Sequence, residues 1–197
     1  KQFLGLSDTP GGQSGGLLSP LLEFIRLGHV SRWVKGPRVL DCGCGRGQIL
    51  NMLNKNIEYT GVDSDVELIE YLNREYPNSD FICSTIENVL TNLENEKYDC
   101  IVMAAIIEHV EEPELLIKNL KKLLTENGRI IVTTPNPIFE KLYEFGAKIG
   151  FFDHHADEDH EKLISMNSLK KFSENSNLSI IRFYKFLFGA NQIIIYS

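Results

Sequence analysis

The sequence lacks any apolar run that approaches the roughly 20 residues of a membrane-spanning helix. Its opening stretch, KQFLGLSDTPGGQSGG, also lacks the apolar core of a secretory signal peptide. These two absences predict a protein with no membrane span and a cytoplasmic location.

Basic residues are scarce relative to acidic ones. The chain has 20 Lys and Arg against 27 Asp and Glu, which gives a formal net charge of -7. Proteins that bind nucleic acid usually carry a basic patch or stripe. We therefore expect no nucleic-acid partner, and the sequence leaves the oligomeric state open.

The four cysteines form no Cys-x-x-Cys pair of the kind that binds zinc. Cys42 and Cys44 are too close together for a zinc half-site, and Cys83 and Cys100 are isolated in the sequence. Because free cysteine is usually buried, we interpret all four as small buried residues or turn residues in a reducing cytoplasm.

The sequence does contain a glycine-rich stretch, VLDCGCGRG, at residues 39–47. An apolar run ends in Asp41, glycines then alternate with other residues, and a helical pattern begins at Gln48. This order predicts a strand, a tight turn and a helix. Glycine has no Cβ and tolerates positive φ, so the turn lets the backbone approach a ligand closely. The first N–H groups of the helix would be available to that ligand.

Apolar segments alternate with helical patterns along most of the chain. Near-continuous apolar strands separated by helices are typical of a parallel sheet covered on both faces. Gly189-Ala190 is too short for a crossover helix, so the last two strands should be antiparallel. Asn127-Gly128 should end a helix with a left-handed cap. We expect strands at residues 38–41, 58–63, 80–83, 98–104, 129–134, 178–186 and 191–196, and helices at 19–34, 47–55, 66–76, 113–125, 138–149 and 167–175.

The fold class that follows is α/β. We expect a doubly wound seven-stranded sheet, mostly parallel with an antiparallel last strand, and helices on both faces. Residues 1–17 should form a flexible N-terminal segment, and residues 18–197 a single domain. Residues 136–166 interrupt the alternation past a strand end, so we expect them to form an insertion or lid that carries specificity.

The neighbours of the glycine turn narrow the choice of ligand. A dinucleotide site carries Gly-x-Gly-x-x-Gly; Gly43 and Gly45 fit this pattern, but Gln48 stands at the third position. Asp41 would repel a pyrophosphate and suits a cationic group. Asp63 ends the next strand, where a carboxylate can accept hydrogen bonds from both hydroxyls of a ribose. The turn therefore favours a ribose-bearing cation, although either acid could instead serve as a backbone cap.

Four segments together resemble the class I, seven-stranded S-adenosylmethionine-dependent methyltransferases. They are DCGCGRG after the first strand, GVDSD at the second, YDCIVMAAIIEHVEEP at the fourth and LLTENGRIIVTTPNP at the fifth. The resemblance covers residues 34–197 and is closest to the small-molecule group with Glu-His after strand four. It implies S-adenosyl-L-methionine as cofactor and S-adenosyl-L-homocysteine as product. The acceptor would be an O, N or C atom of a small molecule or saccharide-linked metabolite.

The resemblance also implies which residues hold the cofactor. Asp41 would neighbour its ammonium group, and Asp63 would bind its ribose hydroxyls. Where the family often has an Asp for the adenine amino group, this chain has Thr85, which offers only a hydroxyl. The other cofactor-binding positions that the resemblance implies are Gly43, Cys44, Gly45, Gly47, Ser64, Ile86 and Ala104.

Candidate catalytic residues are His109, His160 and Glu108, because an oxygen or nitrogen acceptor often needs a base and histidine titrates near neutral pH. Some relatives that methylate RNA ends bind a metal through Glu-x-x-Glu-His and a later histidine. Here Ala105 replaces the first glutamate, so we expect no metal. An NAD-type oxidoreductase and a non-catalytic relative that only binds the cofactor stay open as alternatives.

Overall fold

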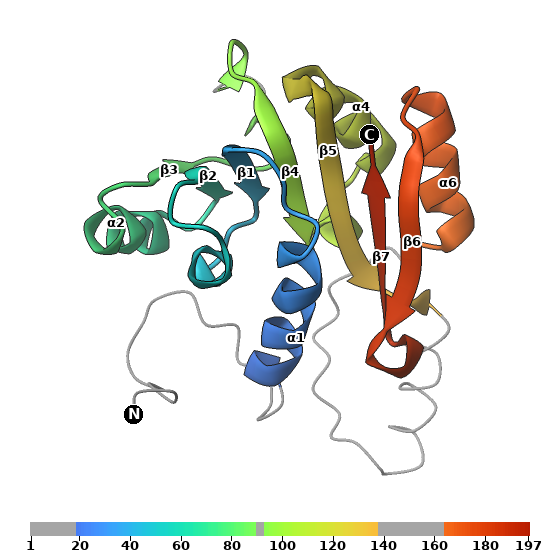
Figure 1. Cartoon of the computed structure of the whole chain (residues 1–197), viewed down its shortest axis with the longest axis horizontal. Coiled ribbons are helices and arrows are strands. Elements are labelled where there is room, and N and C mark those ends of the chain that lie inside the picture. Colours follow the sequence, from blue (N-terminus) through green and yellow to red (C-terminus); the bar gives the residue numbers. More distant parts are fainter. Residues whose placement is uncertain (1–18, 90–92, 138–163) are drawn as a thin grey trace.

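The computed structural model describes residues 19–89, 93–137 and 164–197 (Figure 1). Four of the expectations above concern residues outside these ranges, in whole or in most part. They are the flexible segment 1–17, the helix at 138–149, most of the 136–166 lid, and His160.

Seven strands form one sheet in the order β3-β2-β1-β4-β5-β7-β6. Every neighbouring pair is parallel except β5 with β7 and β7 with β6. The expected doubly wound sheet with its antiparallel last strand is therefore confirmed, and the strand order reverses beside β1. The strands are β1 (Arg38–Cys42), β2 (Glu58–Asp63), β3 (Asp80–Cys83), β4 (Tyr98–Ala104), β5 (Leu124–Pro135), β6 (Ile180–Phe186) and β7 (Asn191–Tyr196).

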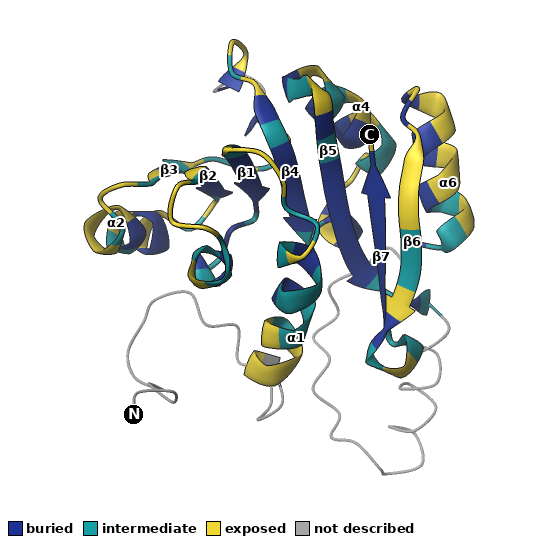
Figure 2. Cartoon of the chain, viewed as in Figure 1, coloured by how far each residue is buried: buried dark blue, intermediate teal, exposed yellow. Residues whose placement is uncertain are grey.

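Helices cover both faces of the sheet, and each face has its own apolar core. Side chains of α1, η1 and α2 pack on one face, and side chains of α4 and α6 pack on the other. Burial on both sides explains why the central strands are apolar over most of their length (Figure 2). The helices are α1 (Ser19–Ser31), α2 (Val66–Glu75), α4 (Pro113–Leu120) and α6 (Met166–Asn175), with short 3-10 helices η1 (Gln48–Met52), η2 (Ile107–His109), η3 (Lys121–Leu123) and η4 (Leu187–Gly189).

Helix α2 illustrates how local sequence fixes an element. The Asp65 side chain accepts a hydrogen bond from the Leu68 N–H at 3.1 Å and so caps the first turn. Leu68, Ile69 and Leu72 follow at helical spacing and are buried against the sheet. Because the cap lets α2 begin at Val66, only two residues separate the helix from Asp63, which is the last residue of β2.

The helix expected at 47–55 is wrong in type and length, because only the 3-10 helix η1 forms there. Gly47 at its N-cap has a φ of 65° and offers no side chain to cap the first N–H groups. Asn51 and Asn54 are also weak helix formers. A short segment of this kind tightens into 3-10 turns instead of extending as an α-helix.

The helix expected at 113–125 is too long, and the left-handed cap at Asn127-Gly128 is wrong. The α-helix ends at Leu120, and Gly128 lies inside β5. A Cβ at Gly128 would stand 3.0 Å from the Tyr98 carbonyl oxygen, next to an irregular register between β4 and β5. This glycine therefore permits close approach of two strands and does not end a helix.

Among the described residues, no helix combines the length and apolar character that crossing a membrane requires.

Candidate functional site

The glycine turn joins β1 to η1 at the carboxyl edge of the parallel strands. Gly43, Gly45 and Gly47 all have positive φ, at 72°, 49° and 65°. The N–H groups of Gly43 and Cys44 donate to the Val62 carbonyl at 2.8 and 3.0 Å, and that of Gly47 donates to Cys44 at 2.9 Å. These N–H groups are thus used within the protein and hold the turn against β2, so the turn is formed before any ligand arrives.

Gly43 is required for close packing as well as for its backbone conformation. A Cβ there would stand 2.2 Å from Cδ1 of Ile106, which precedes η2. Ile106 therefore lies directly against the turn. The first glycine and the segment after β4 form adjoining walls of one site.

Asp63 connects the turn to the end of β2. Its Oδ2 accepts a hydrogen bond from the Gly45 N–H at 2.9 Å, and its Oδ1 accepts one from the Asp65 N–H at 3.1 Å. These bonds fix the carboxylate, and each oxygen keeps a further lone pair for an outside donor. Asp65, not Asp63, caps helix α2, so the capping alternative for Asp63 is wrong.

Asp41 lies beneath the turn and is 3% exposed. The Tyr59 hydroxyl donates to its Oδ2 at 2.7 Å. Burial raises the pKa of Asp41 to about 6, and the bond from Tyr59 opposes that rise. The carboxyl group therefore gains its negative charge near pH 6, close to neutral pH.

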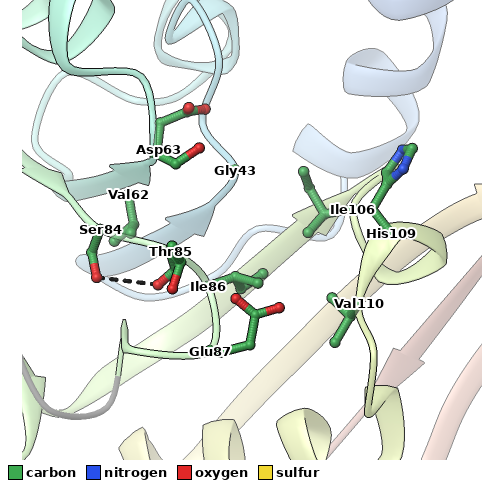
Figure 3. A pocket seen from close by; sticks show the side chains of 11 residues that line it. Gly43, Val62, Asp63, Ser84, Thr85, Ile86, Glu87, Ile106, His109 and Val110 are labelled. Atoms are coloured by element: carbon green, nitrogen blue, oxygen red, sulfur yellow. Dashed lines mark hydrogen bonds between the residues drawn. The ribbon is translucent and has the colours of Figure 1, made fainter. Parts of the chain in front are cut away.

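A cavity of about 260 Å³ opens beside Gly43 and Asp63 (Figure 3). The loop after β3 supplies one wall, and Ile106 with the end of η2 supplies the opposite wall. The volume is near the lower end of small-molecule sites. Its lining residues are Gly43, Val62, Asp63, Ser64, Ser84, Thr85, Ile86, Glu87, Ile106, His109 and Val110.

Five of the cofactor-binding residues expected from the sequence line this cavity. The others lie in the turn or in the strands beneath it. The sequence reasoning missed Val62, Ser84, Glu87, Ile106 and Val110. Only Glu87 carried a usable signal, because it is an acid two residues after Thr85, where the resemblance led us to look for one. The five that were found are Gly43, Asp63, Ser64, Thr85 and Ile86.

The catalytic candidates are separated by the structure. His109 is exposed and lines the cavity on the η2 side, beyond Ile106 as seen from Asp63 (Figure 3). Glu108 is 4% exposed and does not line the cavity. Burial raises its pKa, while His109 and Arg26 of α1 act in the opposite direction. The geometry therefore brings His109 to the site and places Glu108 in the packing behind it.

The cysteines have no disulfide partner among the described residues. Cys42, Cys44 and Cys100 are buried. Cys83 is exposed at the last residue of β3, so the interpretation as a buried or turn residue is wrong for this cysteine. Burial raises the pKa of the three buried thiols well above its usual value. They are protonated packing residues, as their positions in the sequence predicted.

Comparison with known proteins gives matches along most of the chain. A family model described as "Methyltransferase domain" matches residues 17–182. The ubiquinone biosynthesis O-methyltransferase of Coxiella burnetii is 29% identical over 171 residues, which cover 82% of this chain and 72% of that protein.

Two solved structures share the fold at low sequence identity. An S-adenosylmethionine-dependent methyltransferase from Archaeoglobus fulgidus aligns with a TM-score of 0.69 at 20% identity, over 90% of this chain and 93% of that chain. A magnesium protoporphyrin IX methyltransferase from Synechocystis, solved with bound S-adenosylhomocysteine, aligns with a TM-score of 0.70 at 16% identity, over 94% and 89%.

Proposed function

The chain belongs to the methyltransferase domain family and is an S-adenosylmethionine-dependent methyltransferase; we propose that it transfers the methyl group to an oxygen atom of a small molecule. One observation carries the proposal. Asp63, fixed by two backbone bonds, and His109, a titratable side chain, line the same cavity beside the glycine turn. The oxygen acceptor is favoured because the Coxiella relative is an O-methyltransferase.

The charged and polar groups at the site suit the cofactor. Asp63 keeps lone pairs that can accept the ribose hydroxyls, and buried Asp41 offers a negative charge for the ammonium group. Ser64, Thr85 and Ile86 line the part of the cavity where the adenine would lie. Cys44, Gly45, Gly47 and Ala104 complete our proposed set by shaping the backbone around the methionine portion.

When bound, the cofactor supplies an electrophilic methyl group on a sulfonium. The chain's own task is to align the acceptor, exclude water and receive a proton. We assign His109 to take the hydroxyl proton as the acceptor oxygen forms its bond to the methyl carbon and the carbon–sulfur bond breaks. Glu108 would position η2 from behind, because it is buried outside the cavity. His160 stays a second candidate base, since it lies outside the described residues.

Incubation of the whole chain with methyl-labelled S-adenosylmethionine and a panel of phenols, alcohols and amines tests the acceptor class. Mass spectrometry and NMR of the product should place the label on oxygen. A label found only on nitrogen or carbon would overturn the O-methyl proposal. Tight binding of S-adenosylhomocysteine with no labelled product from any acceptor would favour the non-catalytic alternative.

His109→Asn tests the base. The variant should lower kcat by roughly 10²- to 10⁴-fold, the usual contribution of a general base, and leave the affinity for S-adenosylhomocysteine unchanged. His29→Asn is the matched control, because His29 lies on α1 and lines a different cavity. Full activity of His109→Asn would refute the assignment and leave His160 as the candidate.

A further inference from the structure

A second hollow of about 330 Å³ lies between the C-terminal end of α1 and strand β6. His29 on α1, with Arg32 and Trp33 just beyond its end, forms one side, and Arg182 and Tyr184 of β6 form the other. This hollow shares no lining residue with the cavity beside Asp63. It has the volume of a small-molecule site and is not part of the methyl-transfer machinery.

The charge around this hollow is opposite to that of the molecule. The chain has a net charge of -7, yet the lining contains two arginines and no carboxylate. Both ion pairs that join described residues involve Arg38, so no described carboxylate neutralises Arg32 or Arg182. Two guanidinium groups at one hollow form a site for an oxyanion, since each presents a planar fork of donors.

The aromatic part of the lining is held in place by hydrogen bonds. The Trp33 Nε1–H donates to the Tyr184 hydroxyl at 3.2 Å, and His29 Nδ1 lies 3.2 Å from the same oxygen. The His29 ring also packs 4.4 Å from the ring of Phe186. Behind Trp33, an Arg129 Nη1–H donates to its carbonyl at 3.4 Å. These contacts lock the rings, so Trp33 and Tyr184 present fixed aromatic surfaces beside the two arginines.

Burial and the neighbouring Arg32 lower the pKa of His29. The imidazole is therefore neutral at neutral pH and can accept the Tyr184 proton. The Tyr184 hydroxyl then donates its hydrogen to His29 and accepts the Trp33 N–H through a lone pair. The groups that remain for a ligand are the guanidinium groups and the ring faces.

We propose that this hollow binds a small phosphate ester that carries a planar ring, of the nucleoside monophosphate class. Arg32 and Arg182 bind the phosphate oxygens, and the base or another flat ring stacks on Trp33 or Tyr184. Stacking on aromatic faces tolerates every base, so the site selects for the combination of ring and phosphate and not for one nucleobase.

Calorimetric titration of the whole chain with AMP tests the proposal. The protein is first saturated with S-adenosylhomocysteine, so that AMP cannot enter the cavity beside Asp63. AMP should bind the saturated protein, and its affinity should fall as salt is added. Replacing both cations (Arg32→Ala with Arg182→Ala) should weaken AMP binding by roughly tenfold or more, the scale of lost charge-assisted hydrogen bonds. Both side chains are exposed, and circular dichroism verifies that the variant is folded.

Lys185→Ala is the matched control. It removes one positive charge from the same strand, but residue 185 alternates with Tyr184 and faces the other side of the sheet. It should leave AMP affinity unchanged. Trp33→Leu should bring AMP affinity down toward that of inorganic phosphate, because it removes one ring and also the N–H that holds the Tyr184 hydroxyl.

Four results would overturn the proposal. They are no AMP binding to the saturated wild type, equal AMP affinity in the double arginine variant, adenosine binding as tightly as AMP, and inorganic phosphate binding as tightly as AMP. Adenosine tests whether the arginines read the phosphate, and inorganic phosphate tests whether the rings contribute.

Discussion

Asp63 is the single side chain on which cofactor affinity should depend most. Asp63→Ala should weaken S-adenosylhomocysteine binding by about 1.5–3 kcal/mol, the scale of hydrogen bonds to a charged group. Calorimetric titration measures the change. Unchanged affinity would refute the ribose role.

The control for that variant is Asp65→Ala. Asp65 is two residues away and caps α2 through the Leu68 N–H. Its loss should lower the free energy of unfolding by about 1 kcal/mol and leave the affinity for S-adenosylhomocysteine nearly unchanged. The pair of variants thus separates a structural carboxylate from a ligand-binding one.

Asp41 should make both stability and cofactor affinity depend on pH. Burial raises its pKa from 3.8 to about 6 in the folded protein, so the folded state holds this proton more tightly than the unfolded state. The ligand-free protein should therefore lose stability as pH rises from about 4 to about 6, by at most about 3 kcal/mol. Denaturant unfolding of wild type and Asp41→Asn across this range measures that loss, which the variant should lack.

Cofactor affinity should have the opposite dependence, because only ionised Asp41 attracts the ammonium group. S-adenosylhomocysteine binding should weaken as pH falls through about 6, and Asp41→Asn should flatten the curve. Tyr59→Phe removes the hydrogen bond that lowers the Asp41 pKa, so it should move the midpoint to higher pH. A wild-type affinity that does not vary between pH 5 and pH 7 would contradict this role.

At the scale of elements, the turn between β1 and η1 should be sensitive to a single methyl group. Gly43→Ala places a Cβ against Ile106 at a positive φ. It should lower the free energy of unfolding by more than about 1 kcal/mol and reduce cofactor affinity.

Gly28→Ala is the control, because a Cβ there meets nothing within 4 Å. Gly28 lies inside α1, so its replacement should stabilise by about 0.5–1 kcal/mol. Equal effects of both changes on affinity would contradict a special role for the turn.

Elements were predictable where pattern and packing agree. Strands β2, β3, β4 and β7 begin and end where the sequence placed them. For β2, β4 and β7 the reason is that apolar runs covered on both faces have few alternatives. The segment after Gly47 and the segment around Gly128 were not predictable. The first segment starts at Gly47, which leaves η1 without a side-chain cap. The second packs against the Tyr98 carbonyl on the neighbouring strand β4.

The site residues were likewise predictable only where the local sequence marks them, and not where contacts between distant segments create the site. Gly43, Asp63 and His109 could be predicted as candidates, and all three line the cavity, because each stands at or just after a strand end or within a recognisable motif. Ile106 and Glu87 line the cavity as well. Nothing local marks Ile106 as a wall of the glycine turn, since that contact exists only after β1 and β4 pair.

At the scale of the whole molecule, activity should not depend on a metal ion. Within the described ranges, no three His, Cys, Asp or Glu side chains are grouped to hold one. Ala105 stands where the metal-binding pattern has its first glutamate, so activity should survive treatment with a chelator and removal of the chelated metal. Loss of activity that a divalent ion restores would contradict this expectation.

Whether the glycine turn and Asp63 hold S-adenosylmethionine or a dinucleotide is tested most directly by calorimetric titration of the whole chain. S-adenosylhomocysteine and NAD are titrated separately into the ligand-free protein. S-adenosylhomocysteine should bind at one site per chain, and a repeat titration with NAD already present should give the same S-adenosylhomocysteine affinity. Binding of NAD to a chain that does not bind S-adenosylhomocysteine would contradict the assignment of this site.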